Sequence, residues 1–488
     1  MELNFNNSFA KELKDFYEFT RAEKSTSPKM IKFNDSLAKE LGPKWEQLTL
    51  DNGLLIFSGN EIPKGSQPLS QAYSGHQFGG FSPLLGDGRA ILLGEIIDKN
   101  NMRRDIQLKG SGRTIFSRGG DGKSSLGPVL REYLISEAMH SLNIPTTRAL
   151  AAVSSGDDVF REKVLPGGIL TRVASSHIRV GTFQYASTTG DLEKIRALSD
   201  YSINRHYKSL LQRKDKYLEF FEAVCESQLN LISKWMGIGF IHGVMNTDNM
   251  TISGETIDYG PCAFMDRYDP STFFSSIDTQ GRYAYSNQPL ILLWNLTRFA
   301  ETLIPLIDKN EKNAIEILSQ KISLIQNKYE KAWLKIMLEK VGIFSIQDGD
   351  LNLINDILDI MKNEKADFTL VFRYLADFII GKENLLIDLF DDTNKINKWI
   401  VNWKNRIEKE GKFDKSLCIR MKKINPLYIP RNHLVEHALD EALSRENYKP
   451  FHNLLNFVTN PFDEISNSKE YTLPAPVTDT PYKTFCGT

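Results

Sequence analysis

A glycine-dense stretch over residues 110–127 constrains the fold of this chain more than any other feature of its sequence. Two short apolar runs precede it, at residues 90–97 and 106–109, and their length and composition predict β-strands. Pro128 follows it, and because proline suits the first turn of a helix, we expect a helix from there to about residue 142. Glycines let the backbone approach a phosphate chain closely, so the order of strands, glycine loop and helix indicates a nucleotide site.

A second group of polar residues lies further along the chain, in a histidine-containing loop. A helix is predicted over residues 215–236 and is followed by the sequence IHGVMNTDN at residues 241–249. Residues 250–258 are a candidate β-hairpin that turns at Ser-Gly-Glu and ends in Asp-Tyr-Gly. Because a hairpin brings its two ends together, we expect Asn249 and Asp258 to share one Mg²⁺ through oxygen ligands.

These parts follow one another in the order in which protein kinases carry them: glycine turn, strand lysine, helix glutamate, histidine loop and Asp-x-Gly. In the kinase catalytic loop an asparagine follows the histidine by seven residues, and the same spacing separates His242 from Asn249. The position of the kinase proton acceptor is occupied by Val244, which cannot accept a proton. Asp248 is the nearest carboxylate, so ordinary kinase chemistry is expected to be changed or absent.

Seven blocks of sequence carry a more specific likeness: QAYSGHQFG at 71–79, QLKGSGRT at 107–114, SRGGDG at 117–122, SEAMH at 136–140, PTTRAL at 145–150, VMNTDNM at 244–250 and TIDYGP at 256–261. They resemble the selenoprotein O family, whose bacterial members are the YdiU proteins. The resemblance is strong over residues 65–290 and extends through the proline-rich tail to the terminal Cys-Gly-Thr.

The resemblance implies a protein-kinase-like fold and an unusual use of the nucleotide. Members of the family bind ATP in an orientation flipped relative to kinases and transfer AMP to protein hydroxyls, and bacterial members are also described as transferring UMP. The chain is therefore expected to use ATP, with UTP as the alternative, together with Mg²⁺ or Mn²⁺. Its protein partners would be substrates modified on Ser, Thr or Tyr, including the chain itself.

The resemblance also assigns roles to residues. Lys109 resembles the phosphate-binding lysine, with Glu132 as its partner on the helix and Glu137 as the second candidate. Asp248 would accept the proton, and Asn249 and Asp258 would hold the metal. The other expected nucleotide contacts are a glycine turn, a second loop and two phosphate-binding arginines: Gly86, Gly88, Arg89, Asp121, Gly122, Arg172 and Arg179.

We therefore expect an α+β, protein-kinase-like two-lobe fold with a mixed strand and helix N-lobe and a large helical C-lobe. The expected divisions are an N-terminal extension over 1–65 with a short helix near 8–19, an N-lobe over 66–185 with further strands near 148–153 and 167–173, a C-lobe over 186–455 and an extended tail over 456–488. The expected activity is protein adenylyltransfer. The alternatives are an ATP-binding pseudokinase scaffold without catalysis and a divergent protein kinase.

Composition excludes several other classes of function. The chain has 60 Lys and Arg against 61 Asp and Glu, a balance that argues against a broad nucleic-acid surface. No apolar run approaches the roughly 20 residues of a membrane-spanning helix, and the N-terminus resembles neither a signal nor a transit peptide. We therefore expect a cytoplasmic protein that binds neither nucleic acid nor membrane.

The four cysteines have no metal-ligand spacing and fit a reducing compartment. Cys262 lies four residues after Asp258, and Cys486 is third from the C-terminus. One hypothesis is a reversible disulfide between Cys262 and Cys486 that ties the tail to the active-site loop. The alternative is two unrelated thiols, because the sequence does not place their Cα atoms within bonding range.

Overall fold

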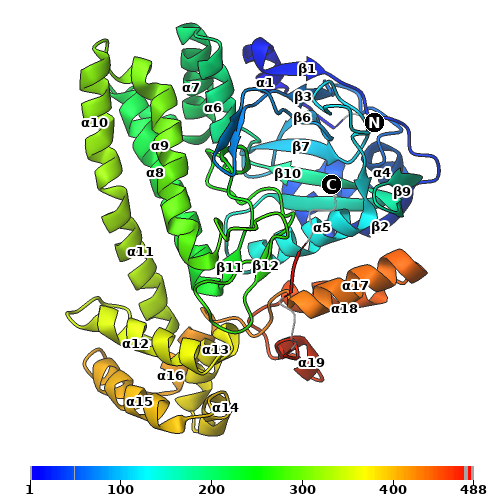
Figure 1. Cartoon of the computed structure of the whole chain (residues 1–488). Helices are drawn as coiled ribbons and strands as arrows, with labels where there is room; N and C mark the ends of the chain where they lie inside the picture. The colour runs from blue at the N-terminus through cyan, green and yellow to red at the C-terminus, as the bar shows by residue number, and fades with distance from the viewer. Residues whose placement is uncertain (1–2, 49, 478–481, 485–488) are drawn as a thin grey trace.

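The computed structural model of the chain describes residues 3–48, 50–477 and 482–484, and it has the expected α+β, kinase-like two-lobe architecture (Figure 1). The N-lobe is built on an antiparallel sheet of eight strands in the described chain, and the C-lobe is helical. The strands run in the spatial order β1, β3, β6, β7, β10, β9 and β2, with β8 paired to β10. Their bounds are β1 Tyr17–Phe19, β2 Lys29–Phe33, β3 Leu69–Gln71, β6 Ala90–Ile97, β7 Arg103–Lys109, β8 Ser124–Ser125, β9 Arg148–Phe160 and β10 Val164–Ala174.

The strands predicted at 90–97, 106–109, 148–153 and 167–173 are confirmed, and three of them are longer than expected. β9 and β10 continue pairing to Phe160 and Val164, where both side chains are exposed. The apolar pattern marks only the part of a strand that faces the core, whereas backbone pairing can extend beyond it into solvent.

The first 65 residues hold both ends of the sheet. β1 pairs with β3, and β2 pairs with β9. The helix predicted near 8–19 is wrong beyond residue 12: α1 spans Ser8–Glu12, the 3-10 turn η1 spans Lys14–Phe16, and the chain is then extended in β1. The pairing of β1 with β3, a tertiary contact, overrides the local helical pattern. The divisions near residues 65, 185 and 455 stay predictions.

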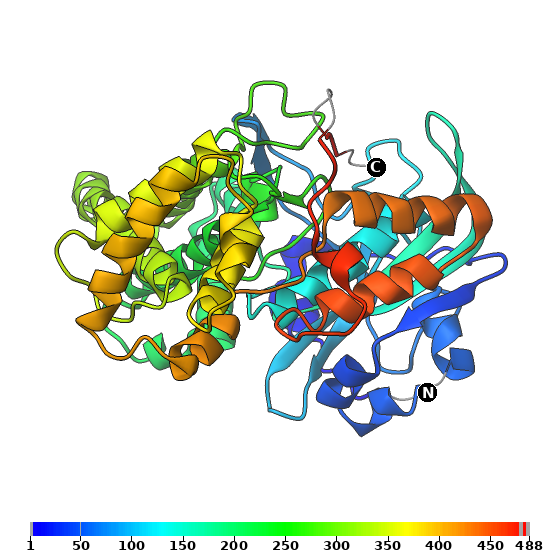
Figure 2. The ribbon, with the colours of Figure 1, turned by 90° about the horizontal axis from the view of Figure 1, so that it is seen from below.

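Helices cover both faces of the sheet. On one face lie α2 (Asp35–Leu41), α3 (Pro43–Glu46) and α4 (Leu50–Phe57), whose apolar side chains pack with those of β6, β7, β9 and β10. On the other face lies α5 (Leu126–Ser141), close to the predicted helix, which contacts β9 and β10. Two late helices, α17 (Asn432–Arg445) and α18 (Lys449–Val458), return to pack on α5, as Figures 1 and 2 show.

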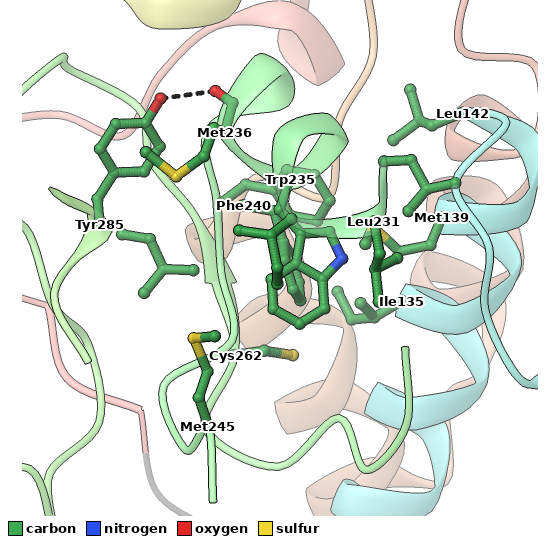
Figure 3. Packing of buried hydrophobic residues seen from close by; sticks show 14 of the residues in the cluster. Ile135, Met139, Leu142, Leu231, Trp235, Met236, Phe240, Met245, Cys262 and Tyr285 are labelled. Carbon is green, nitrogen blue, oxygen red and sulfur yellow. Dashed lines mark hydrogen bonds between the residues drawn. The ribbon is translucent and has the colours of Figure 1, made fainter. Parts of the chain in front are cut away.

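The C-lobe is organised around α8 (Lys216–Ile238), the long helix that the sequence predicts. Figure 3 shows how Leu231 and Trp235 of α8 pack with Ile135 and Met139 of α5, which joins the two lobes, and how Cys262 lies in the same packing. The other helices of the lobe are α6 Val180–Thr188, α7 Leu192–His206, α9 Gln288–Ile307, α10 Glu311–Ser323, α11 Ile325–Lys340, α12 Asp350–Asn363, α13 Phe368–Phe378, α14 Glu383–Ile387, α15 Thr393–Glu408 and α16 Lys415–Lys422.

By length and composition alone, one helix in the described chain, Tyr285–Ile307, could cross a membrane, which the sequence had not led us to expect. This helix contains α9, whose buried side contacts α6, α8 and α10. Packing in the core of the C-lobe therefore accounts for its apolar character.

The tail is only partly extended. It contains the short helix α19 (Lys469–Thr472), and its last described residues run beside the loop that precedes α9. There Thr484 exchanges backbone hydrogen bonds with Phe274 and Ser276, and its hydroxyl donates to the carbonyl of Pro261. Cys262 is fully buried as a thiol, and Cys486 lies outside the described residues, so the disulfide between them stays a hypothesis.

Candidate active site

A cleft of about 830 Å³ lies where the N-lobe meets the C-lobe, a size suited to a small-molecule ligand. All of the residues that the sequence assigns to the site line it: Gly86, Gly88, Arg89, Lys109, Asp121, Gly122, Glu132, Arg172, Arg179, Asp248, Asn249 and Asp258. These residues come from two strands (β7 and β10), one α-helix (α5), the 3-10 turn Thr247–Asn249 and several loops that are far apart in the sequence. The fold therefore brings together in one cavity residues that the sequence could only place in order.

A compact ionic cluster occupies the centre of this cleft. Lys109 Nζ lies 2.6 Å from Glu132 and 2.8 Å from Asp258. Arg172 Nη1 lies 2.7 Å from the same oxygen of Asp258 and 3.2 Å from Glu132, and Arg179 Nη1 lies 2.6 Å from the other oxygen of Asp258. Three cations thus converge on the single carboxylate of Asp258.

Glu132, and not the second candidate Glu137, is the partner of Lys109. Glu137 instead accepts two hydrogen bonds from Arg148, at 2.9 and 2.8 Å, and one from the backbone N–H of Ala149. Glu137 therefore links α5 to the start of β9.

The opposite charges of the cluster stabilise one another. Burial by itself would raise the pKa of Asp258, but Lys109, Arg172 and Arg179 outweigh it and hold that pKa well below its usual range. Burial would lower the pKa of Arg172 and of Arg179, but Asp258 and other acidic groups around them raise it. Asp258, Arg172 and Arg179 are thus all charged at neutral pH. An anion that replaced Asp258 as the partner of the two arginines would bind to groups that are already positively charged and in place.

The sheet positions Arg172 through a residue that the sequence analysis missed. In the register of β7 and β10, Gln107 lies opposite Arg172. Gln107 Oε1 accepts hydrogen bonds from Nε and Nη2 of Arg172 at 3.1 and 2.6 Å, and its Nε2 donates to Asp87 at 3.2 Å. Gln107 could have been found by strand periodicity, because it stands two residues before Lys109 and so faces the same side of β7.

Two glycines that line the cleft lie at turns where a side chain would not fit. Gly86 and Gly122 both have positive φ, +68° and +67°, which favours glycine. A Cβ on Gly86 would overlap the ring of Phe116, and one on Gly122 would overlap the carbonyl of Gly112. Beside them Arg161 binds both oxygens of Asp121, at 2.9 and 3.1 Å, so Asp121 lies in the cleft as an ion pair.

The predicted hairpin at 250–258 does not form. Its first arm bonds to residues 178–180, its second arm bonds to residues 145–147, and the turn between them is closed by the hydroxyl of Thr251, which binds the backbone of Glu255. Because each arm satisfies its backbone groups with a different segment, no ladder forms between the arms. Asn249 and Asp258 nevertheless line the same cleft.

The loop between His242 and Asn249 turns one carboxylate toward the cleft. Val244 lines the cavity at the position of the kinase base, and its carbonyl accepts from the amide of Asn249 at 2.9 Å. Asp248 is buried, and Gln77 Nε2 donates to its Oδ2 at 3.2 Å. Its Oδ1 has no hydrogen-bond partner within the described chain. Burial raises the pKa of Asp248 to about 6, although the bond from Gln77 opposes the shift.

Comparison with known proteins agrees with this geometry. The family model described as protein adenylyltransferase SelO matches residues 1–459. The chain belongs to the SelO family. A protein nucleotidyltransferase YdiU of Cereibacter sphaeroides is 51% identical to it over 490 residues, with 100% of both chains covered. Its counterpart in Rhizobium johnstonii is 49% identical over 486 residues, covering 99% of this chain and 97% of the relative. As a SelO-family member the chain is a protein nucleotidyltransferase.

The oxygen donors of this SelO-family site suit a hard divalent cation. In the described part of the chain, no group of three or more His, Cys, Asp or Glu side chains is arranged to hold a metal ion by itself. Mg²⁺ is commonly held by one or two carboxylates together with substrate phosphates. The amide oxygen of Asn249 and the carboxylate of Asp258 fit that arrangement, with Asp248 as a further carboxylate beside them.

Proposed function

We propose that this chain is a protein adenylyltransferase that moves AMP from ATP to Ser, Thr or Tyr hydroxyls of proteins, its own included, with UTP as the alternative donor. The observation that carries the proposal is the convergence of Lys109, Arg172 and Arg179 within one cleft that also holds Asp248 but lacks a kinase base at Val244.

The three cations suit the leaving group of adenylyl transfer. If the β and γ phosphates lie against Lys109, Arg172 and Arg179, the negative charge that builds up on pyrophosphate is stabilised by groups already in place. The guanidinium groups can each bind two phosphate oxygens, whereas the lysine acts as a point charge. Such a placement leaves the α-phosphate toward the open side of the cleft, and the nucleoside toward Asp121 and Gly122.

Asp248 is suited to receive the proton of the attacking hydroxyl. The acceptor oxygen forms a bond to the α-phosphorus, the bond from that phosphorus to the bridging oxygen of the β-phosphate breaks, and pyrophosphate leaves with the electron pair. The hydroxyl proton passes to Asp248, which Gln77 holds in place. A divalent cation held by Asn249 and Asp258 would add positive charge beside the phosphates.

Parallel reactions with α-labelled and γ-labelled ATP test the proposal. The purified chain is incubated with Mg²⁺ or Mn²⁺ and a protein mixture, and label on protein is followed after denaturing electrophoresis. We expect label from the α position only, together with released pyrophosphate. Label from the γ position only would establish a divergent kinase. ATP binding without either label would establish a scaffold, and each of these results would overturn the proposal. α-labelled UTP in the same assay compares the two donors.

A further inference from the structure

A small hairpin outside the main sheet holds the loop that contains Asp248. It consists of β4 (Gly75–Gln77) and β5 (Gly80–Ser82). Its first strand and its turn belong to the block QAYSGHQFG at 71–79, of which the proposed chemistry uses only Gln77. In Figures 1 and 2 this blue hairpin lies beside the green loop that precedes α9.

Three successive hairpin residues bind three successive residues of the loop between His242 and Asn249. The backbone N–H of His76 donates to Thr247 at 2.7 Å, and the backbone N–H of Phe78 donates to Asn246 at 3.1 Å. Between them, the side chain of Gln77 donates to Asp248. The hairpin therefore has a fixed position relative to the proposed proton acceptor.

A helix of the C-lobe, α6, binds both the hairpin and the loop of Asp248. Gln184 of α6 lies 2.7 Å from the ring of His76 and accepts a hydrogen bond from Thr247 at 2.6 Å. A Cβ on Gly75 would overlap Asp248, so the hairpin backbone lies directly against that carboxylate. A rigid element this close to the reacting groups is suited to positioning a substrate.

The tip of the hairpin is strained. Phe78 has φ of +51° and Gly79 has φ of +89°, the two-residue turn that usually carries Asn-Gly. This backbone conformation is unfavourable for phenylalanine, because its Cβ comes too close to the following carbonyl oxygen. The bond from its N–H to Asn246 and the contact of its ring with Tyr283, 5.2 Å between centroids, hold it there. Strain of this kind is found most often at functional sites.

The strained tip presents apolar surface at the mouth of the cleft. Phe78, Phe81 and Ile277 are 39%, 46% and 54% exposed, and Phe78 and Ile277 also line the cavity. Single exposed apolar side chains are ordinary, but Phe78 and Phe81 lie on the hairpin that binds the loop of Asp248, and Ile277 lines the same cleft as Asp248.

An arginine without an acidic partner lies next to the tip. The guanidinium of Arg282 is 3.8 Å from the position of a Cβ on Gly79, and it stacks on Trp294 at 5.2 Å. None of the described carboxylates forms an ion pair with Arg282, whereas the neighbouring Arg298 pairs with Glu301. The surface therefore combines apolar anchors with one available positive charge.

We infer that this hairpin rim, defined by Phe78, Phe81, Ile277 and Arg282, binds the segment of the acceptor protein that carries the target hydroxyl. The charge and the apolar side chains favour an acceptor segment with an acidic and a large apolar residue beside that hydroxyl. The inference rests on the proposed function, because only a protein acceptor must reach Asp248 from the open side of the cleft.

Synthetic peptides test the inference. Each contains one Tyr, Ser or Thr, with Asp, Lys, Phe or Ala at the flanking positions, and labelling from α-labelled ATP is measured. We expect the wild type to select Asp and Phe. Phe81→Ser and Ile277→Ser should each raise the peptide KM about tenfold while kcat and the Kd for ATP stay within twofold. Arg282→Glu should reverse the preference from Asp to Lys, and Arg282→Lys should retain the preference for Asp.

Matched surface substitutions provide the controls. Phe19→Ser changes an exposed phenylalanine on β1, and Arg445→Gln changes an exposed arginine of α17, and neither residue lines the cleft. Both should keep the wild-type peptide KM. Rim variants that label the peptides with unchanged KM and unchanged preference would overturn the inference and leave the proposed function intact. A wild type that binds ATP but labels neither peptide nor protein would overturn both.

Discussion

Gln107 and Arg172 face each other across β7 and β10, and a single amide oxygen of Gln107 accepts two hydrogen bonds from the guanidinium of Arg172. The other end of the same amide binds Asp87, which lies 3.8 Å from Arg179. Gln107 therefore fixes the plane of Arg172, one of the two arginines that we propose to bind phosphate, and links it through Asp87 to the surroundings of the other, Arg179. It is a positioning residue, because no part of its proposed role requires contact with the nucleotide.

Gln107→Leu is expected to weaken nucleotide binding without unfolding the protein. A hydrogen bond to a charged group contributes about 1.5–3 kcal/mol, so the Kd for ATP should rise roughly 10- to 100-fold. Isothermal titration with a non-hydrolysable ATP analogue measures the effect. Thr171→Val is the neighbouring control on β10: the Thr171 hydroxyl has no hydrogen-bond partner among the described residues, so this variant should bind like the wild type. Equal affinities for Gln107→Leu and the wild type would contradict the positioning role.

Asp258→Asn is expected to abolish metal-dependent transfer and to reduce stability. The substitution keeps the shape of the side chain but removes the negative charge that Lys109, Arg172 and Arg179 share. Breaking a buried ion pair from one side typically costs about 3–5 kcal/mol. Thermal unfolding should therefore shift downward, and nucleotide should raise the melting temperature more than in the wild type, since phosphates would restore the missing charge. Wild-type transfer by this variant would refute the metal-ligand assignment.

Asp248→Asn separates binding from chemistry. The variant should bind ATP with wild-type affinity, because Asp248 contacts none of the three cations by a direct ion pair in the described structure. Transfer of α-label to protein should fall about 10²- to 10⁴-fold, the usual contribution of a positioned proton acceptor. Single-turnover labelling measures the rate. A rate within twofold of the wild type would show that another group accepts the proton.

The sequence singled out residues that line one cleft in the structure, but it could not place the contacts among them. It expected Glu132 to be the partner of Lys109 and kept Glu137 as a second candidate, because both lie on one helix. The structure separates them, since Glu137 binds Arg148 at the start of β9. It predicted a hairpin at 250–258, but the two arms bind other segments whose arrival there is a tertiary event. Gln77 and Arg282 were missed for the same reason, since their significance lies in partners distant in the sequence.

Lys340 gives a pH-dependent stability that is independent of the active site. It is buried in α11 with its ammonium 4.5 Å from the ring centroid of Phe372, and burial lowers its pKa to about 7. From that pH up to the ordinary value of 10.5, the unfolded chain holds a proton that the folded chain lacks. Stability should therefore rise with pH in this window, by about 1.4 kcal/mol per unit.

Lys340→Met removes this dependence. The variant should melt at a higher temperature than the wild type near pH 7, and the difference should shrink toward pH 10. Differential scanning calorimetry across this range measures it. Lys335→Met, at an exposed position of the same helix, should leave the pH dependence of the wild type unchanged. A constant difference between Lys340→Met and the wild type at all pH values would contradict the lowered pKa.

Alanine substitutions at two glycines of one loop separate the effect of backbone strain from the effect of close packing. Gly119 and Gly122 both have positive φ, +86° and +67°, so alanine at either position is strained by about 1–2 kcal/mol. A Cβ on Gly119 meets nothing within 4 Å, whereas one on Gly122 would overlap the carbonyl of Gly112. Gly122→Ala should therefore displace the loop beside Asp121 and raise the Kd for ATP at least tenfold, and Gly119→Ala should change it less than threefold. If both variants bind ATP alike, the close approach of Gly122 to Gly112 does not shape the nucleotide site.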